Sequence, residues 1–403
     1  MLSALAGATP RHAGNADAPL PKAPVLGWDS FWPPGRGDAP NVGDLPHRLL
    51  TTSGRAALHL ALLQMGLPAG SGVLVPTYHC PTMVAPIIEA GLSPVYYSLV
   101  DDGTPDVERI ELGAPGPRAM VVAHFFGLAR SLAPVRAWCD ARGILMIEDC
   151  AHCYFGQAGE RPIGSWGDYA TASLTKFFPV AEAGLLASAT RALTPAALSA
   201  PGVRAQLKSA WDVVHHSRQH GRLAGLSQLT APLVMLRERM PRAPDPLAQN
   251  SADLDDEAIR ASCDMGRIRE RPSIATRLLL AALPAGRIAE RRRHNYAVLA
   301  KALDSAPHAH VLQADPGPHS APYVLPLVAD DPARADAVYA RLRAARMPVF
   351  RWDRLWPGTP RMTGDMGHTW SRELLQLLCH QDLSDDDLVA VAAEARQALA
   401  AEH

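Results

Sequence analysis

An apolar run that ends in two acids, Leu145–Asp149, places the strongest constraint on how this chain folds. Such a run is typical of a strand buried in a parallel sheet, and it would bring Asp149 to the carboxyl edge of the sheet, where α/β proteins bind ligands. The segments 72–80, 87–97 and 119–127 each contain a similar apolar run bounded by turn or polar residues. Because helical patterns separate the runs, the sequence predicts an α/β domain with a mostly parallel sheet.

A lysine follows this acid at a spacing of 27 residues, in the segment Ser173-Leu-Thr-Lys176. An aspartate and a lysine at neighbouring strand ends suit pyridoxal phosphate, whose aldehyde needs a lysine for a Schiff base and whose ring nitrogen needs a carboxylate to hold its proton. Taken singly, each residue has a plainer interpretation, since strand-end aspartates often cap helices and most lysines are solvated. The order of the surrounding segments favours the cofactor.

A third signal precedes both residues, at the start of a predicted helix. The segment Ser53-Gly54-Arg55 opens a run whose apolar residues between 58 and 65 cover one broad face. Small residues at a helix start leave backbone N–H groups free to bind a phosphate, and the helix dipole favours the negative charge there. This feature alone is weak evidence, but it lies in the expected position relative to Asp149 and Lys176.

In this order the segments resemble the DegT/DnrJ class of fold-type-I pyridoxal-phosphate enzymes, the nucleotide-sugar aminotransferase family. The resemblance runs from about Ser53 to the C-terminus, with a poorly matching middle. It implies a fold-type-I large domain and a smaller C-terminal α+β domain. The matching motifs are Ser53-Gly-x-Ala-Ala-Leu58, Val75-Pro-x-Tyr78, His124-x-x-Gly127, Glu148-Asp-x-Ala-His152, and Ser173-Leu-Thr-Lys176 followed by Ala181-Glu182-Ala183-Gly184.

The resemblance implies two catalytic residues and a phosphate site. Lys176 would form the internal aldimine with pyridoxal 5′-phosphate, and Asp149 would pair with the pyridinium nitrogen. Ser173 and the backbone amides of Gly54 and Arg55 would hold the phosphate.

Three further residues are expected near the cofactor ring. His79 or Cys80 falls where the family places a ring-stacking aromatic, and the literal alignment favours Cys80. His152 matches a family position close to the cofactor. A histidine satisfied at a helix start is an equally good interpretation of His152.

One family segment has no clear counterpart in this chain. The Gly-Tyr-Asn-x-Arg stretch that reaches the cofactor phosphate of the neighbouring subunit is missing, and the segments 264–267 and 271–273 occupy its approximate place. A polar residue there is a candidate replacement. The basic residues of this region, including Arg267 and Arg271, are more often part of a solvated face.

The function implied by the resemblance is the transfer of an amino group from an amino acid, glutamate or glutamine, to a keto-sugar that is nucleotide-linked in the family. A homodimer with shared active sites is expected with it. Two alternatives remain at this stage. One is a pyridoxal-phosphate enzyme of another reaction type, such as elimination or acyl transfer, and the other is a non-catalytic scaffold or regulator with the same fold.

Composition sets broad limits on partners and location. The 403 residues are 48% hydrophobic and 20% charged with a formal net charge of -1, which is typical of a globular protein without a field that attracts nucleic acid or anionic membranes. No apolar stretch approaches the ~18 residues of a membrane span, and we expect a cytoplasmic location. The pair Cys150 and Cys153 lacks the second pair that a zinc site needs, so packed reduced thiols and no metal are expected.

Four regions are predicted along the chain. Residues 1–45 form an irregular arm whose aromatic residues pack on the body or line the mouth of the site, and residues 46–189 form the cofactor domain. Residues 190–286 form a mainly helical insert, and residues 287–403 form a linker helix and the C-terminal α+β domain. In that last domain Arg351 either approaches an anionic substrate or lies at a strand edge in solvent.

Overall fold

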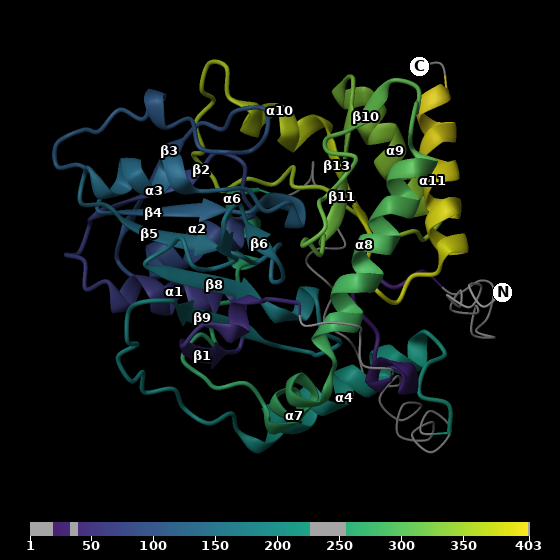
Figure 1. The fold of residues 1–403 in the computed structure, drawn as a ribbon, viewed down its shortest axis with the longest axis horizontal. Coiled ribbons are helices and arrows are strands. Elements are labelled where there is room, and N and C mark those ends of the chain that lie inside the picture. Colours follow the sequence, from purple (N-terminus) through teal and green to yellow (C-terminus); the bar gives the residue numbers. More distant parts are fainter. Residues whose placement is uncertain (1–18, 33–38, 226–254, 402–403) are drawn as a thin grey trace.

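The computed structural model describes residues 19–32, 39–225 and 255–401. A seven-stranded sheet with the order β1-β9-β8-β5-β4-β2-β3 forms the body of the molecule, and a four-stranded sheet with the order β10-β11-β13-β12 lies beside it (Figure 1). Strand β9 runs antiparallel to its neighbours β1 and β8, and the strands β8, β5, β4, β2 and β3 are parallel. The predicted α/β fold with a mostly parallel sheet is confirmed.

The large sheet and its helices have the following bounds. Its strands are β1 (His47–Thr51), β2 (Gly72–Pro76), β3 (Ser93–Tyr97), β4 (Ala119–Ala123), β5 (Leu145–Asp149), β8 (Tyr169–Ser173) and β9 (Gly184–Ser188), and a small hairpin pairs β6 (Gln157–Ala158) with β7 (Arg161–Pro162). The helices up to the linker are α1 (Gly54–Gln64), α2 (Pro81–Glu89), α3 (Ala133–Asp140), α4 (Val203–Gln219), α6 (Asp256–Ala261) and α7 (Ile274–Ala282).

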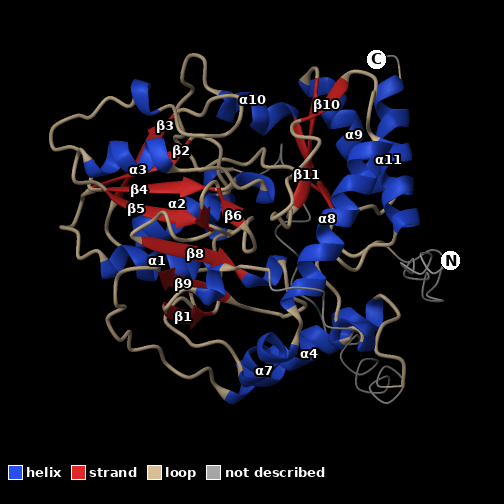
Figure 2. Ribbon diagram, in the orientation of Figure 1, coloured by secondary structure: helices blue, strands red, loops and turns tan. Residues whose placement is uncertain are grey.

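Both faces of the large sheet are buried, which is why its strands are apolar throughout. Alternate residues point to opposite faces. Val73, Val75 and Ile147 pack in one core cluster with residues of α1 and α2. Leu74 and Met146 belong to the core on the opposite face, which continues into the C-terminal domain. Helices therefore flank the strands (Figure 2), as parallel sheets require.

The C-terminal domain is an antiparallel sheet covered by helices. It contains β10 (Ala309–Val311), β11 (Val324–Ala329), β12 (Val349–Phe350) and β13 (Leu374–Leu378), with α8 (Ala285–Ala302), α9 (Pro332–Ala344), α10 (Met366–Glu373) and α11 (Asp385–Ala400). Strand β13 was not predicted, although it pairs with both β11 and β12. Its five residues are all buried, and a short apolar run of this kind cannot be assigned to strand or helix by periodicity.

Aromatic side chains join the two sheets. The Tyr78 ring lies 5.2 Å from that of Trp352 and 5.5 Å from that of Trp370, centroid to centroid. Its hydroxyl accepts a hydrogen bond of 3.1 Å from Gln376 on β13. The loop that follows β2 and contains Tyr78 is therefore fixed against the C-terminal domain on one side of the predicted site.

The N-terminal arm is held by aliphatic residues. Val25 and Leu26 are buried, and the Val25 N–H donates to Asp382 at 3.0 Å. Trp28 and Trp32 are 59% and 71% exposed. Trp28 nevertheless ties the arm to the body, because its Nε1 donates to the Ala224 carbonyl at 3.1 Å. The expectation that the aromatic residues pack the arm onto the body is not met by Trp32, which is largely exposed. No helix in the described parts of the chain is long and apolar enough to cross a membrane.

Candidate active site

A cavity of about 380 Å³ lies where β5 and β8 end and α1 begins. The strand ends contribute Asp149, Thr171 and Ser173, and the short helix that follows β8 contributes Lys176. Gly54 and Arg55 come from the first turn of α1. Side chains separated by more than 100 residues of sequence thus face one space at the carboxyl edge of the sheet, as the sequence predicted for this fold.

Lys176 lies in the cavity next to an aromatic ring. Its Nζ lies 5.1 Å from the centroid of the Tyr323 ring, and burial lowers the pKa of the amine although Cys80 and Asp149 act in the opposite direction. A lower pKa increases the fraction of neutral amine near neutral pH. The Lys176 carbonyl accepts a hydrogen bond of 2.5 Å from Arg292, a fully buried residue of α8.

One carboxylate oxygen of Asp149 is hydrogen-bonded by neighbouring groups of the protein. Oδ1 accepts hydrogen bonds from the Ala151 N–H at 2.9 Å and from the Thr171 hydroxyl at 3.2 Å. Burial raises the pKa of the carboxyl, and these hydrogen bonds together with the Lys176 charge lower it. Among the described residues no donor reaches Oδ2, so this oxygen is available to a ligand.

The start of α1 forms a narrow cradle. Ser53 caps the helix by accepting from the Ala56 N–H at 3.2 Å. A Cβ on Gly54 would lie 3.1 Å from the Ser173 Cβ, and a Cβ on Gly184 would lie 2.1 Å from the Ser53 carbonyl oxygen. Gly184 therefore leaves no space for a side chain, and a Cβ at Gly54 would fit only tightly. Free N–H groups and the helix dipole at a helix start attract anions, and the Ser173 hydroxyl adds a further donor to this turn.

The structure separates the two residues expected to stack on the cofactor ring. Cys80 lines the cavity. His79 points into the protein, where its Nδ1 contacts the Pro76 carbonyl at 2.9 Å and its Nε2 accepts from the Trp356 N–H at 3.0 Å. His79 therefore packs the C-terminal domain onto the large one, and it is Cys80 that the literal alignment and the structure both place at the site.

His152 is buried just outside the residues that line the cavity. Its ring lies 4.5 Å from that of Tyr323 and 4.7 Å from that of Trp352, and its Nδ1 accepts from the Phe126 N–H at 3.3 Å. Burial lowers the pKa of this imidazole, with a further contribution from the Lys176 charge. Its Nε2 is buried and has no partner among the described residues, so His152 is only partly satisfied by packing.

Behind Asp149, Glu148 fixes the loop that follows β7. Its carboxylate accepts from the N–H groups of Gly164 and Trp166, each at 2.7 Å, and lies 2.9 Å from His124 Nε2. The acidic pair that ends β5 thus has two different tasks. Glu148 supports the loop from inside the protein, and Asp149 faces the cavity. The thiols of Cys150 and Cys153 are free and fully buried next to this strand end.

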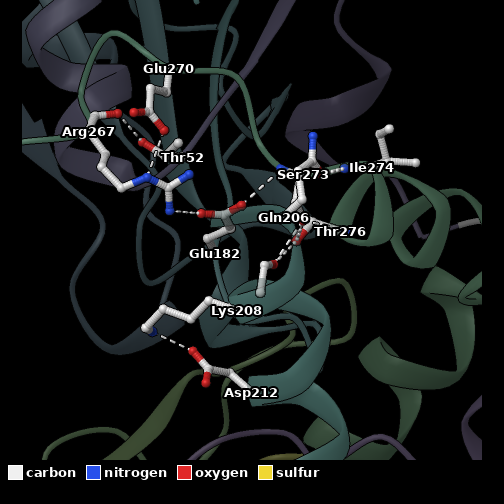
Figure 3. Close-up of polar contacts among 11 residues, drawn as sticks. Thr52, Glu182, Gln206, Lys208, Asp212, Arg267, Glu270, Ser273, Ile274 and Thr276 are labelled. Carbon is white, nitrogen blue, oxygen red and sulfur yellow. Dashed lines mark hydrogen bonds and ion pairs between the residues drawn. The ribbon is translucent and has the colours of Figure 1, made fainter. Parts of the chain in front are cut away.

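Residues of the helical insert line one side of the cavity, and Figure 3 shows three of them, Lys208, Asp212 and Arg267. Lys208, Ser209 and Asp212 of α4 line it, as does Arg267 from the segment between α6 and α7. Arg267 forms ion pairs with Glu182 and with Glu270, the latter at 2.7 Å, and its carbonyl accepts from the Thr52 hydroxyl at 2.7 Å.

The second carboxylate oxygen of Glu182 holds the start of α7. It accepts from the Ser273 N–H at 2.8 Å, as Figure 3 shows. Ser273 in turn contacts the Ser209 hydroxyl of α4 at 2.8 Å. Arg267 is therefore only partly solvated, because its side chain is 36% exposed and pairs with the buried Glu182. The residues 226–254, which include Arg237, Arg239 and Arg242, lie outside the described part of the chain.

Two other predicted arginines lie away from the cavity. Arg271 lines a separate, more apolar cavity beside β1. Arg351 follows the edge strand β12, forms an ion pair with Asp336, which is 68% exposed, and donates to the Arg372 carbonyl. The arginine therefore lies at a strand edge, as one of the two interpretations expects, although its own side chain is only 8% exposed.

Sequence reasoning missed several residues of the cavity. Thr171 precedes Ser173 by two positions on β8, and residues two apart share one face of a strand; this spacing was a usable signal. Lys208 and Asp212 are four apart on α4 and pair at 2.5 Å, but nothing in the sequence indicates that this face of the helix meets the sheet.

The fold and the lysine-aspartate cavity define an α/β protein built to bind a cofactor at the sheet edge. Residues 42–241 match the DegT/DnrJ/EryC1/StrS aminotransferase family, and the chain carries a domain of that family. Among solved structures, DesI in the presence of its TDP-sugar product has a TM-score of 0.62, is 18% identical and is matched over 95% of each chain. A family aminotransferase from Brucella abortus has a TM-score of 0.59 and is 18% identical, matched over 88% of this chain and 86% of its own.

Two curated relatives match part of the chain. The GDP-perosamine synthase of Vibrio cholerae is 29% identical over 148 residues, which cover 35% of this chain and 40% of the relative. The UDP-N-acetyl-3-dehydro-alpha-D-glucosamine 3-aminotransferase of Acidithiobacillus ferrooxidans is 27% identical over 179 residues, which cover 43% and 47%. The chain therefore matches less than half the length of these relatives.

The cofactor of this family is pyridoxal 5′-phosphate, and the residues of the cavity fit it. Lys176 and Asp149 share one space. Gly54 has no side chain, so the backbone N–H groups of this turn are open to a phosphate, and an added Cβ would lie 3.1 Å from the Ser173 Cβ. Lys176 would hold the aldehyde carbon, Asp149 the ring nitrogen, and Ser173 with the Gly54 and Arg55 amides the phosphate.

Proposed function

We propose that this protein is a pyridoxal-phosphate-dependent aminotransferase that moves an amino group from glutamate or glutamine to a keto-sugar. The observation that supports this most directly is the convergence of Lys176, Asp149 and the start of α1 on one cavity. When bound, the cofactor supplies an electron sink for the carbon that carries the amino group. The relatives named above support a sugar acceptor, and the nucleotide part of that acceptor is a family expectation.

The residues of the chain then have distinct tasks. The Lys176 amine, whose pKa burial lowers, holds the cofactor and, once displaced by the amino donor, moves a proton at the reacting carbon; such transfers contribute about 10²–10⁴ in rate. Asp149 keeps the ring nitrogen protonated through Oδ2, while Ala151 and Thr171 hold Oδ1. Helix α4 and Arg267 close one side of the cavity and reduce access of water.

The test is a chemical trap. The protein is incubated with pyridoxal phosphate, reduced with borohydride and digested, and mass spectrometry locates the modified lysine. We expect modification of Lys176, and we expect the cofactor-loaded protein to convert L-glutamate to one equivalent of 2-oxoglutarate before an acceptor is added. Lys176→Ala should give neither result. Lys208→Ala, which removes another lysine of the cavity, should retain both.

The same experiment separates the alternatives. Modification of Lys176 without formation of 2-oxoglutarate from glutamate or glutamine would favour another reaction type, such as elimination or acyl transfer. Absence of cofactor binding with Lys176 intact would overturn the enzyme proposal and favour a scaffold with the same fold.

We also propose that the active protein is a homodimer. Helices α4 and α7 contact each other and present four large apolar residues that are each more than half exposed: Val203, Leu207, Ile274 and Leu278. Adjacent exposed apolar residues of this size mark interaction surfaces. The opposite side of α4 lines the cavity, so a second copy seated here would lie beside the site, as shared active sites require.

Sedimentation equilibrium tests the dimer. We expect the wild type to sediment at twice the chain mass and a Leu207→Asp, Leu278→Asp variant to sediment as a monomer with unchanged circular dichroism. A Val389→Asp variant is the control, since Val389 is 53% exposed on α11 in the C-terminal domain. A monomeric wild type would contradict the proposal.

A further inference from the structure

The cavity has four cationic side chains, and they differ in whether an acid neutralises them. Lys208 pairs with Asp212 at 2.5 Å. Arg267 pairs with Glu182 and Glu270. Lys176 is the amine assigned to the cofactor aldehyde. The remaining cation is Arg55.

Arg55 lines the cavity, is half-buried, and has no hydrogen bond or ion pair to any residue in 19–32, 39–225 or 255–401. A guanidinium with five N–H groups is rarely left without acceptors in a partly buried place.

The surroundings of Arg55 favour an anion. The residue lies in the first turn of α1, where the helix dipole and the free N–H groups of the turn already attract negative charge. The acids of the cavity that carry an ion pair are engaged with other cations, Asp212 with Lys208 and Glu182 with Arg267. Asp149 and Asp264 also line the cavity, and neither forms an ion pair with Arg55. An oxyanion brought in by a ligand would thus meet a guanidinium that is not paired with any acid of the described residues.

We propose that the Arg55 side chain, and not its backbone amide alone, binds an oxyanion of the ligand in the cavity of its own chain. This inference rests on the proposed function, which supplies two oxyanions: the cofactor phosphate and an acidic group of a substrate. Both would be recognised by the same charge-assisted hydrogen bonds. The anion would then be bound by a cation of its own chain. This matters because the family's Asn-x-Arg stretch, which reaches the cofactor phosphate of the neighbouring subunit, has no clear counterpart in this chain.

The experiment compares Arg55→Ala with the wild type in two sets of binding measurements. Tryptophan fluorescence gives the dissociation constants of pyridoxal phosphate and of pyridoxal, which lacks the phosphate. Calorimetry on the cofactor-loaded protein gives those of glutarate and of uridine diphosphate, which serve as acidic substrate probes. Because the variant loses hydrogen bonds between two charged groups, we expect at least one anionic ligand to bind about tenfold more weakly or worse.

The pattern of affinity changes among the four ligands shows which oxyanion Arg55 binds. Loss of the preference for pyridoxal phosphate over pyridoxal assigns Arg55 to the cofactor phosphate. An unchanged preference with weaker binding of glutarate or uridine diphosphate assigns it to the substrate. Arg55→Lys should restore part of the lost affinity, because lysine retains the positive charge but lacks the planar set of N–H donors of the guanidinium.

Lys208→Ala is the matched control, since it removes a cation of the same cavity that already has an acid partner. We expect its affinities to change less than about threefold. The inference is overturned if Arg55→Ala leaves all four ligands unaffected, or if Lys208→Ala weakens the same ligand equally. A wild type that binds no pyridoxal phosphate would instead overturn the proposed function, so the two failures are distinguishable.

Discussion

At the scale of single residues, the environment of Asp149 assigns its task. The sequence places an acid at the end of β5, but only the structure shows that Oδ1 is held by Ala151 and Thr171 and that burial raises the pKa of the carboxyl. A carboxyl whose pKa is higher in the folded chain than in the unfolded one costs stability when the pH rises through that range. The charge is therefore kept for a ligand and not for the fold.

Asp149→Asn tests this view, because the amide can still accept both hydrogen bonds at Oδ1 while it carries no charge. We expect the rate of 2-oxoglutarate formation from glutamate to fall by about 10²–10³, the typical effect of removing one electrostatic contact in an active site. The cofactor-free variant should be at least as stable as the wild type at pH 7 in urea unfolding. A variant with the wild-type rate would show that Asp149 does not control the ring nitrogen.

At the scale of elements, helix α8 carries an arginine on its apolar side. Ile288, Tyr296 and Leu299 are buried as the spacing predicts, and Arg292 occupies the same side and is fully buried. It donates to the Lys176 carbonyl, to the Pro322 carbonyl at 3.2 Å and to Gln381 at 3.0 Å. Burial lowers its pKa to about 10. The linker helix thereby holds the segment that carries Lys176, the lysine that we propose holds the cofactor.

Arg292→Lys should separate charge from geometry, since one ammonium group cannot reach three acceptors on three segments. Each buried acceptor that loses its donor costs about 1–3 kcal/mol, and we expect the free energy of unfolding in urea to fall by at least that amount. Arg293→Lys is the control, because the half-buried Arg293 makes a single hydrogen bond to the Ser320 carbonyl. Equal effects at the two positions would contradict the anchoring role of Arg292.

At the scale of the whole molecule, two neutral histidines fasten separate parts of the chain together. His79 accepts from the Trp356 N–H with one nitrogen and donates to the Pro76 carbonyl with the other. His380 likewise accepts from the Asp382 N–H at 3.3 Å and donates to the Pro21 carbonyl at 3.0 Å. Burial lowers the pKa of His79 to about 4 and that of His380 to about 3. Each ring can make both bonds only when it is neutral.

Stability should therefore fall in mild acid. The unfolded chain takes up a proton at each histidine near pH 6.5 and the folded chain does not. The stabilisation is fully present above about pH 6.5 and is lost as the pH falls toward 4 and 3. By pH 5 we expect a loss of about 2 kcal/mol for each residue. Urea unfolding at pH 7.5 and pH 5 measures this loss of stability.

The matched variants are His380→Gln and His310→Gln, since His310 is exposed on β10. The first should have a shallower dependence of the unfolding free energy on pH than the wild type. The second should reproduce the wild-type dependence. If His380→Gln has the wild-type dependence, another group is responsible for the acid sensitivity.

The sequence by itself determined the parts of this protein that depend on local order. Apolar strands alternating with helices specify a mostly parallel sheet, and the positions of Asp149, Lys176 and Gly54 along it specify one edge, because parallel strands end on the same side. The choice of Cys80 over His79 as the residue next to the cofactor ring came only from the alignment with the family. These inferences need spacing and the direction of strands, and both are readable from the chain.

The tertiary structure decided everything that depends on which surfaces meet. Whether Arg267, Arg292 and Arg351 face solvent, a ligand or the core follows from the elements packed against them, and a charged residue has the same sequence signal in all three cases. The same holds for α4, whose cavity-lining side is defined by the Glu182 and Ser273 contacts of a distant segment. Burial and pairing are properties of the packed molecule, so only the fold could assign them.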